Sequence, residues 1–233
     1  MSPKIVIVEG NIGVGKSTFI KLFANQFKNS VVIDEPVDLW TEIKDNTGKN
    51  ILGVFYSDIE RWAYTFQSMA YVTRMMKIED KIRENKYDYI FLDRSLGTDR
   101  NVFEKMLYDD KKINQIEHQI YNLWADFYNK YVRPESSYPI IYLRAEPEVS
   151  FERIKKRCRV EEQNISLEYL QKLHQYHEAW LNYPSNSTSN SPSNSPSNST
   201  SPSKSIIIVD CNKDFEDDIN NRNNIFNEIM QKL

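Results

Sequence analysis

The sequence is poor in cysteine, histidine and glycine, with 2, 3 and 6 of these residues among 233. Cys158 and Cys211 are too few for a disulfide framework and lack the spacing of a metal site, so we expect free thiols in a reducing compartment. No apolar run approaches membrane-spanning length. A strand-like segment already starts at Lys4, which leaves no room for a signal peptide. These absences predict a cytoplasmic protein.

An excess of charge of one sign is also missing. The chain has 30 Lys and Arg against 33 Asp and Glu, a net charge of -3. Proteins that bind nucleic acid usually carry a basic surface, so we expect neither nucleic acid nor membrane as a partner. With 40% hydrophobic and 27% charged residues, the composition is that of a globular protein. The length suits one well-buried domain and is short for two.

Short apolar runs alternate with longer helical patterns along the chain. Such nearly continuous runs are typical of strands buried on both faces of a parallel sheet. The runs are Lys4–Val8, Val31–Asp34, Tyr89–Asp93, Ile140–Arg144 and Ile206–Asp210. Apolar residues recur at helical spacing from Phe55 to Met76 and from Ile113 to Tyr131. This alternation predicts an α/β fold, with a parallel sheet of about five strands and helices on both faces.

One segment has a different composition from the rest. Residues 184–205 are almost entirely Ser, Asn, Pro and Thr. Such a segment cannot bury enough apolar surface to offset the entropy lost on ordering it. We therefore expect a disordered and dispensable surface insertion that interrupts a single domain spanning residues 1–233.

A phosphate-binding motif follows the first predicted strand. The segment from Gly10 to Ser17 fits G-x-x-x-x-G-K-[ST], between a strand and an apolar helix. The glycines let backbone N–H groups point inward, and the helix N-terminus adds its positive end. Lys16 would reach the β- and γ-phosphates, and the Ser17 hydroxyl would join a Mg²⁺ shell. The predicted phosphate-binding residues are Gly10, Asn11, Ile12, Gly13, Val14, Gly15, Lys16, Ser17 and Thr18.

Charged residues end the second and third predicted strands. Glu35 follows the second strand, and Asp93 and Arg94 end the third. Ligands of open parallel sheets gather at the carboxyl ends of the strands. One carboxylate there could accept the proton of an attacking hydroxyl while the other orients Mg²⁺. Arg94 could bridge phosphate oxygens. The sequence thus favours phosphoryl transfer.

These motifs, taken in order, resemble the deoxyribonucleoside kinases, including those acting on deoxycytidine, deoxyguanosine and deoxyadenosine. The resemblance covers Ile5 to about Leu181 and Ile206 to Phe215. It implies a P-loop kinase fold and transfer of the γ-phosphate of ATP, with Mg²⁺, to the 5′-hydroxyl of a deoxynucleoside. The residues that carry it are the phosphate loop, Glu35-Pro36 with Trp40, Glu60 to Gln67, Asp93-Arg94-Ser95, and Arg157 to Gln163.

The resemblance also assigns roles at the acceptor side. It implies that Glu35 is the general base. Gln67 would bind the base edge between the apolar walls Trp40 and Phe66. Tyr56 and Glu162 would lie near the sugar 3′-hydroxyl. Tyr56 is expected on the same helix as Gln67.

On the donor side, the resemblance implies an arginine-rich lid over the ATP phosphates. Arg153 and Arg157 are four residues apart, hence on one helical face, and Arg159 follows them. Asp214 and Phe215 would cradle adenine. Asp93 would serve the Mg²⁺ shell and Arg94 the reacting phosphates, although family members often have Glu in place of Asp93. The resemblance further suggests a homodimer.

Base preference depends on one predicted pair. In family members that prefer cytosine or purines, an Arg and an Asp enclose the base, and here Arg74 and Asp99 stand at those positions. We therefore expect deoxyadenosine, deoxyguanosine or deoxycytidine to be favoured over thymidine. Two alternatives remain open: a nucleoside monophosphate kinase of the thymidylate kinase type, and a non-catalytic ATP-binding partner subunit.

Overall fold

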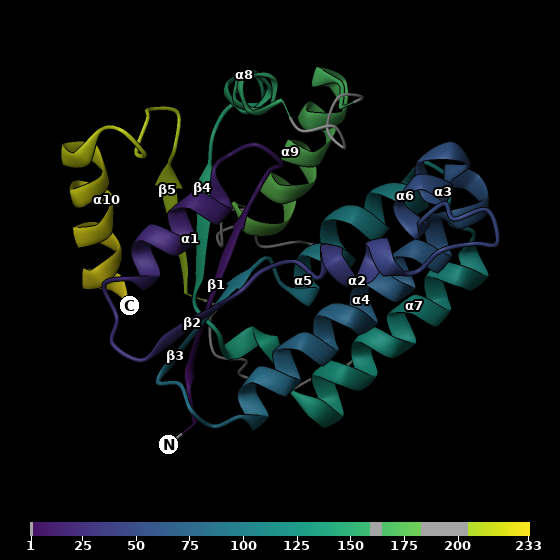
Figure 1. Ribbon diagram of the computed structural model, residues 1–233, viewed down its shortest axis with the longest axis horizontal. Coiled ribbons are helices and arrows are strands. Elements are labelled where there is room, and N and C mark those ends of the chain that lie inside the picture. Colours follow the sequence, from purple (N-terminus) through teal and green to yellow (C-terminus); the bar gives the residue numbers. More distant parts are fainter. Residues whose placement is uncertain (1, 159–164, 183–204) are drawn as a thin grey trace, which may run out of the picture.

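A computed structural model of the protein describes residues 2–158, 165–182 and 205–233 (Figure 1). All its sheet strands are parallel and lie in the order β2-β3-β1-β4-β5. The strands are β1 (Lys4–Gly10), β2 (Ser30–Ile33), β3 (Tyr89–Asp93), β4 (Ile140–Arg144) and β5 (Ile206–Asp210). The predicted α/β class is confirmed. Compared with the prediction, β1 extends two residues further, β2 is shifted one residue earlier, and the other strands agree.

Helices cover both faces of this sheet, as predicted. The helices α1 (Lys16–Ala24) and α10 (Ile219–Lys232) lie on one face, and α4 (Ile59–Arg83) and α9 (Leu167–Leu181) on the other (Figure 1). Alternate residues of β1 feed the two cores: Val6 and Val8 pack toward α1 and α10, while Ile7 packs toward α4 and α9. β1 is therefore buried on both sides and brings the phosphate loop to the middle of the sheet edge.

The remaining elements surround this framework. They are α2 (Val37–Glu42), α3 (Ile51–Ser57), α5 (Leu96–Thr98), the π-helix η1 (Asp99–Glu104), α6 (Lys105–Asp109), α7 (Gln115–Phe127), the π-helix η2 (Tyr128–Val132), the 3₁₀-helix η3 (Glu135–Ser137) and α8 (Pro147–Arg157). Within the described residues, no helix combines the length and apolarity needed to cross a membrane. Cys158 and Cys211 are free thiols, as expected.

The helical pattern from Phe55 to Met76 proves to be two helices rather than one. α3 ends at Ser57, and α4 begins at Ile59. Asp58 separates them with φ −152° and ψ 78°, and its side chain accepts from the Arg61 N–H at 3.1 Å. An N-cap residue requires non-helical dihedrals, so this cap breaks the helix although the apolar spacing continues across it. The prediction that Tyr56 and Gln67 share a helix is wrong.

The helical spacing from Ile113 to Tyr131 corresponds to α7 and η2, but much of its apolar surface faces solvent. Leu123 is 68% exposed and Trp124 59% exposed. Residues 116, 120, 123 and 127 lie on one side of the helix because they are three or four positions apart. The exposed apolar residues of this face, called the α7 stripe below, are Ile116, Ile120, Leu123, Trp124, Phe127 and Tyr131.

Candidate active site

The phosphate loop fits tightly against the elements around it. Gly13 has φ +80°, and a Cβ there would lie 2.6 Å from the Ser150 carbonyl oxygen of α8. Gly15 has φ +105°, and a Cβ there would lie 2.8 Å from the Phe215 ring. Both positions therefore need glycine for space as well as for backbone conformation. Neighbouring elements therefore pack closely around the predicted phosphate loop.

Lys16 and Ser17 begin α1 directly below this loop. The Lys16 ammonium donates to the carbonyls of Gly10 (2.9 Å) and Asn11 (2.8 Å). Burial and the nearby Arg94 guanidinium lower the pKa of Lys16 to about 7. A phosphate oxygen would favour the charged form again, so this lysine is suited to binding an anion.

Glu35 lies between two arginines at the end of β2. Arg74 Nη2 donates to its Oε1 at 3.0 Å, and Arg94 Nη1 contacts the same oxygen at 2.9 Å. Burial alone would raise the pKa of Glu35, but Arg94 and Arg74 outweigh it and lower the pKa to about 2. Oε2 has no hydrogen-bond partner among the described residues, and the side chain is 26% exposed. The carboxylate is ionised and offers one oxygen to a ligand.

Asp93 and Ser17 meet across the sheet edge, where a divalent cation would be expected. The Ser17 hydroxyl donates to Asp93 Oδ2 at 2.9 Å. Asp93 Oδ1 is buried and has no partner within the described part of the chain. Hard oxygen donors of this kind are what Mg²⁺ prefers, and it commonly uses only one or two protein ligands. These residues fit the predicted Mg²⁺ shell. Elsewhere in the described ranges, no group of three or more His, Cys, Asp or Glu could hold a metal.

Arg74 and Asp99, the two residues predicted to determine nucleobase preference, form a buried ion pair. Arg74 Nε donates to Asp99 Oδ2 at 2.8 Å, and Nη2 lies 3.4 Å from Oδ1. Arg74 Nη1 donates to the Asp93 carbonyl at 3.0 Å. This one guanidinium therefore touches the predicted base pocket, the general-base candidate Glu35 and the backbone of the predicted metal ligand Asp93.

Gln67 and Phe66 of α4 and Trp40 of α2 are the residues predicted to surround the base. Trp40 and Phe66 are in edge contact, with ring centroids 5.4 Å apart, and Phe66 stacks on Phe55 at 4.6 Å. Gln67 is buried two turns before Arg74. Tyr56, by contrast, belongs to α3 and is 60% exposed.

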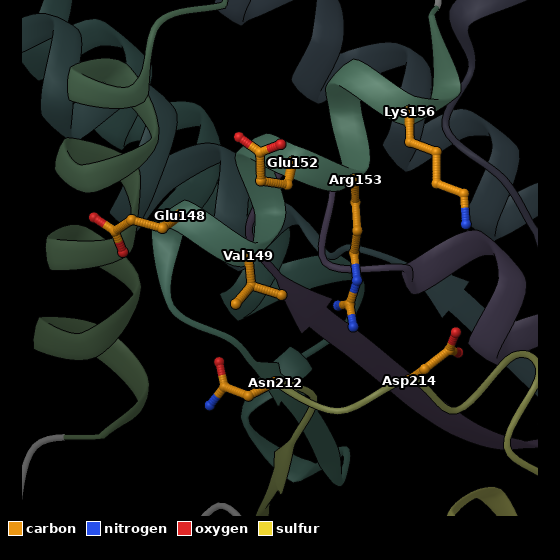
Figure 2. A pocket seen from close by; sticks show the side chains of 7 residues that line it. All are labelled: Glu148, Val149, Glu152, Arg153, Lys156, Asn212 and Asp214. Carbon is orange, nitrogen blue, oxygen red and sulfur yellow. The ribbon is translucent and has the colours of Figure 1, made fainter.

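A hollow lies between α8 and the segment after β5, where Arg153 and Asp214 were predicted to bind ATP. Figure 2 shows Arg153 pointing from α8 toward the segment that carries Asp214. Arg153 donates to the Val14 carbonyl (3.1 Å) and the Lys213 carbonyl (3.3 Å), so it joins the phosphate loop to this segment. The hollow is lined by Glu148, Val149, Glu152, Arg153, Lys156, Asn212 and Asp214.

The other residues predicted to bind ATP differ in their exposure. Arg157 ends α8 and is exposed. Phe215 is only 4% exposed and packs edge-on against Phe19 of α1, which leaves little of its ring for an adenine base. The predictions for Arg159 and Glu162 lie outside the described residues.

One buried carboxylate beside this site was not predicted from the sequence. Glu9 on β1 has no exposed surface, and burial raises its pKa. Ser95 and Thr98, which follow Asp93 and Arg94, donate their hydroxyls to it. The available signal was a charged residue inside an apolar strand, next to the first glycine of the phosphate loop.

Comparison with known proteins gives a consistent result. A family model described as deoxynucleoside kinase matches residues 6–233. A mitochondrial deoxyguanosine kinase of Xenopus laevis is 37% identical over 198 residues, 78% of this chain and 74% of that protein. A deoxycytidine kinase of Homo sapiens is 34% identical over 231 residues, 92% of this chain and 86% of that protein. A probable deoxycytidine kinase of fowlpox virus is 36% identical over 179 residues, covering 77% and 72%.

Proposed function

The chain belongs to the deoxynucleoside kinase family, and on this premise we propose how its own residues carry out phosphoryl transfer from ATP to the 5′-hydroxyl of a deoxynucleoside. The observation that carries the proposal is the position of Glu35. It is an ionised carboxylate at a strand end, bound to Arg74 and Arg94 and with Oε2 unoccupied by the described residues.

In the proposed reaction, the 5′-hydroxyl donates its hydrogen bond to Glu35 Oε2. The hydroxyl oxygen attacks the γ-phosphorus, the bond from that phosphorus to the β,γ-bridging oxygen breaks, and ADP leaves. The hydroxyl proton passes to Glu35 and then to solvent. Arg94 and Lys16 stabilise the charge on the transferring phosphoryl group, as pre-positioned donors do in kinases. Arg94 would release Glu35 when it binds phosphate, which raises the basicity of Glu35 when it is needed.

We propose that Ser17 and Asp93 hold Mg²⁺ with the bound triphosphate. Support comes from the Ser17–Asp93 hydrogen bond and from the unpartnered, buried Asp93 Oδ1. When bound, Mg²⁺ neutralises charge on the β- and γ-phosphates and helps to align them. Arg153, which donates to the Val14 carbonyl at 3.1 Å, would hold the phosphate loop. Asp214 would line the space for adenine.

We expect the acceptor to be a deoxynucleoside other than thymidine. Gln67, Arg74 and Asp99 offer both donors and acceptors to a base, and relatives are named for deoxycytidine and deoxyguanosine. A competition assay with the four deoxynucleosides and their monophosphates tests this directly. Deoxycytidine, deoxyguanosine or deoxyadenosine should give the highest kcat/KM. Faster turnover of a monophosphate would instead support a thymidylate kinase-like activity, and nucleotide binding without turnover would support a non-catalytic partner. The cytoplasmic location stays a prediction from the sequence.

We also propose a homodimer formed through the α7 stripe. The stripe is a row of large apolar side chains on one face of a regular helix, and α7 lies beside α4 (Figure 1). On α4, Val72 and Met76 are also exposed, by 42% and 53%. Several large apolar side chains exposed along one helix face are typical of an interface between subunits.

Placing a charge in the stripe should separate the subunits. Leu123→Glu puts an unpaired carboxylate into the proposed interface, which costs several kcal/mol as an order-of-magnitude expectation for a buried charge. We expect a dimeric wild type and a monomeric variant by light scattering, at concentrations in the micromolar range. The matched control is Gln231→Glu on α10, an exposed polar position that should leave the mass unchanged. A monomeric wild type would contradict the proposal.

A further inference from the structure

Glu9 is a buried carboxylate that neither substrate binding nor proton transfer uses. It lies at the end of β1, immediately before Gly10, and has no exposed surface. No Lys or Arg among the described residues forms an ion pair with it. A buried carboxylate without a cationic partner is costly, because burial disfavours its charged form. The nearby charges of Arg94 and Arg74 favour the ionised form and offset part of this cost, and hydrogen bonds offset a further part.

Two hydroxyl groups donate these hydrogen bonds. Ser95 Oγ donates to Glu9 Oε1 at 2.6 Å, and Thr98 Oγ1 donates to Oε2. The same hydroxyls accept from each other's backbone: Thr98 N–H donates to Ser95 Oγ (3.3 Å) and Ser95 N–H to Thr98 Oγ1 (3.5 Å). Each hydroxyl has one hydrogen and already accepts from an N–H group. The hydrogen bonds that Ser95 and Thr98 donate favour the ionised form of Glu9, although burial has the larger effect and its pKa stays raised.

This arrangement fixes the segment that carries the catalytic residues. Ser95 and Thr98 form the capping box of α5, directly after Asp93 and Arg94. Arg94 has φ +67°, a left-handed conformation that is unfavourable for a residue with a side chain. Its N–H donates to the Val8 carbonyl at 3.0 Å. Glu9 therefore ties this turn, with its unfavourable backbone conformation at Arg94, to the strand that leads into the phosphate loop.

We propose that Glu9 is a positioning residue, which sets the turn from Asp93 to Thr98 in register with the phosphate loop so that Asp93 and Arg94 reach the reacting phosphates. The inference rests on the proposed phosphoryl transfer. Nucleoside binding should depend on Glu9 less than turnover does, because Asp99 is held independently by Arg74 of α4. A misplacement of about 1 Å can lower turnover by about 100-fold.

Glu9→Gln is the first test, since it keeps the shape and replaces one acceptor oxygen by a donor. The amide must then face a hydroxyl hydrogen or force that hydroxyl to turn. We expect kcat to fall by roughly 10- to 100-fold, as for a small misplacement of catalytic groups. The Kd for the nucleoside, followed by tryptophan fluorescence, should stay within about 3-fold, because groups acting only at the transition state change kcat selectively.

A purely structural role would give a different result, and a matched variant separates the two. Glu79 of α4 is another buried carboxylate, bound to Tyr128 and Arg133 away from the phosphate loop. Glu79→Gln should lower the melting temperature, as Glu9→Gln does, without lowering the kcat of the folded protein. If Glu9→Gln also keeps wild-type kcat while the wild type is active, the inference is wrong. An inactive wild type would instead reject the proposed function.

Thr98→Val keeps the inference testable if Glu9→Gln does not fold. It is nearly isosteric and removes one of the two hydroxyls that reach Glu9. It should lower kcat in the same direction, and an unchanged kcat would overturn the inference. Where both variants fold, the double variant should lose little more than Glu9→Gln alone, since residues acting through one hydrogen-bond network are not additive.

Discussion

Replacing Glu35 by glutamine is expected to lower kcat by roughly 10²- to 10⁴-fold, the usual contribution of a general base. The substituted side chain can still present its amide oxygen to Arg74 and Arg94, which contact Oε1 in the native protein. The amide nitrogen then occupies the position of Oε2 and cannot accept the 5′-hydroxyl proton. Nucleoside affinity should change little, because the aromatic pocket and Gln67 remain.

The pH dependence gives this prediction a second measurement. With a pKa lowered to about 2 by Arg94 and Arg74 against the effect of burial, Glu35 stays ionised in the free enzyme at every pH used in an assay. A carboxyl group with a lowered pKa loses its charge only when the pH falls to about that pKa. The ratio of wild-type to variant kcat/KM should therefore be constant between about pH 6 and pH 9, far above the titration of Glu35.

Asp34→Asn is the matched control for Glu35→Gln. Asp34 is the preceding residue, its side chain is exposed, and its backbone carbonyl accepts from Lys77 at 2.9 Å. Removing that charge should leave kcat near the wild-type value. A Glu35→Gln enzyme with near wild-type kcat and unchanged nucleoside binding would show that another group accepts the proton.

The parts of the site predicted well from sequence are those fixed by local chain geometry. The phosphate loop needs a strand, glycines and a helix in immediate succession, and all three are readable between Lys4 and Ala24. The strand ends at Glu35 and Asp93 follow from the rule that parallel strands end at one edge. The pairing of Arg74 with Asp99, far apart in sequence, came from family resemblance rather than from physical pattern.

The parts that could not be predicted have causes that apolar periodicity does not report. The break at Asp58 is invisible to apolar periodicity, which continues from Phe55 through Ile59. Periodicity also cannot say whether an apolar stripe faces a core or another subunit, so the exposure of Leu123 was not foreseen. Glu9 was not predicted because its partners Ser95 and Thr98 lie in the segment after β3. The partners of Glu9 are distant in sequence, whereas the cap at Asp58 is local but leaves the apolar spacing unchanged.

Arg74→Met combined with Asp99→Ala is expected to shift base preference toward thymidine. Asp99 can accept from the exocyclic amine of cytosine or adenine, whereas thymine presents a carbonyl there, so acceptor would face acceptor. Leaving such buried polar groups unpaired costs about 1–3 kcal/mol each. Discrimination against thymidine should thus be roughly 10- to 100-fold in the wild type, at about 1.4 kcal/mol per decade. The double variant removes both polar groups and opens space for the thymine methyl.

The contacts of Arg74 determine how this experiment must be read. Arg74 also donates to Glu35 and to the Asp93 carbonyl, so the double variant loses two contacts to the proposed catalytic residues. Turnover should therefore fall for every substrate, and the quantity to compare is the ratio of kcat/KM for thymidine to that for each other deoxynucleoside. Arg83→Met, an exposed change at the far end of α4, should leave that ratio unaltered. If the ratio of the double variant equals that of the wild type, Arg74 and Asp99 serve only to position Glu35 and Asp93, and base selection must come from Gln67 and the aromatic walls.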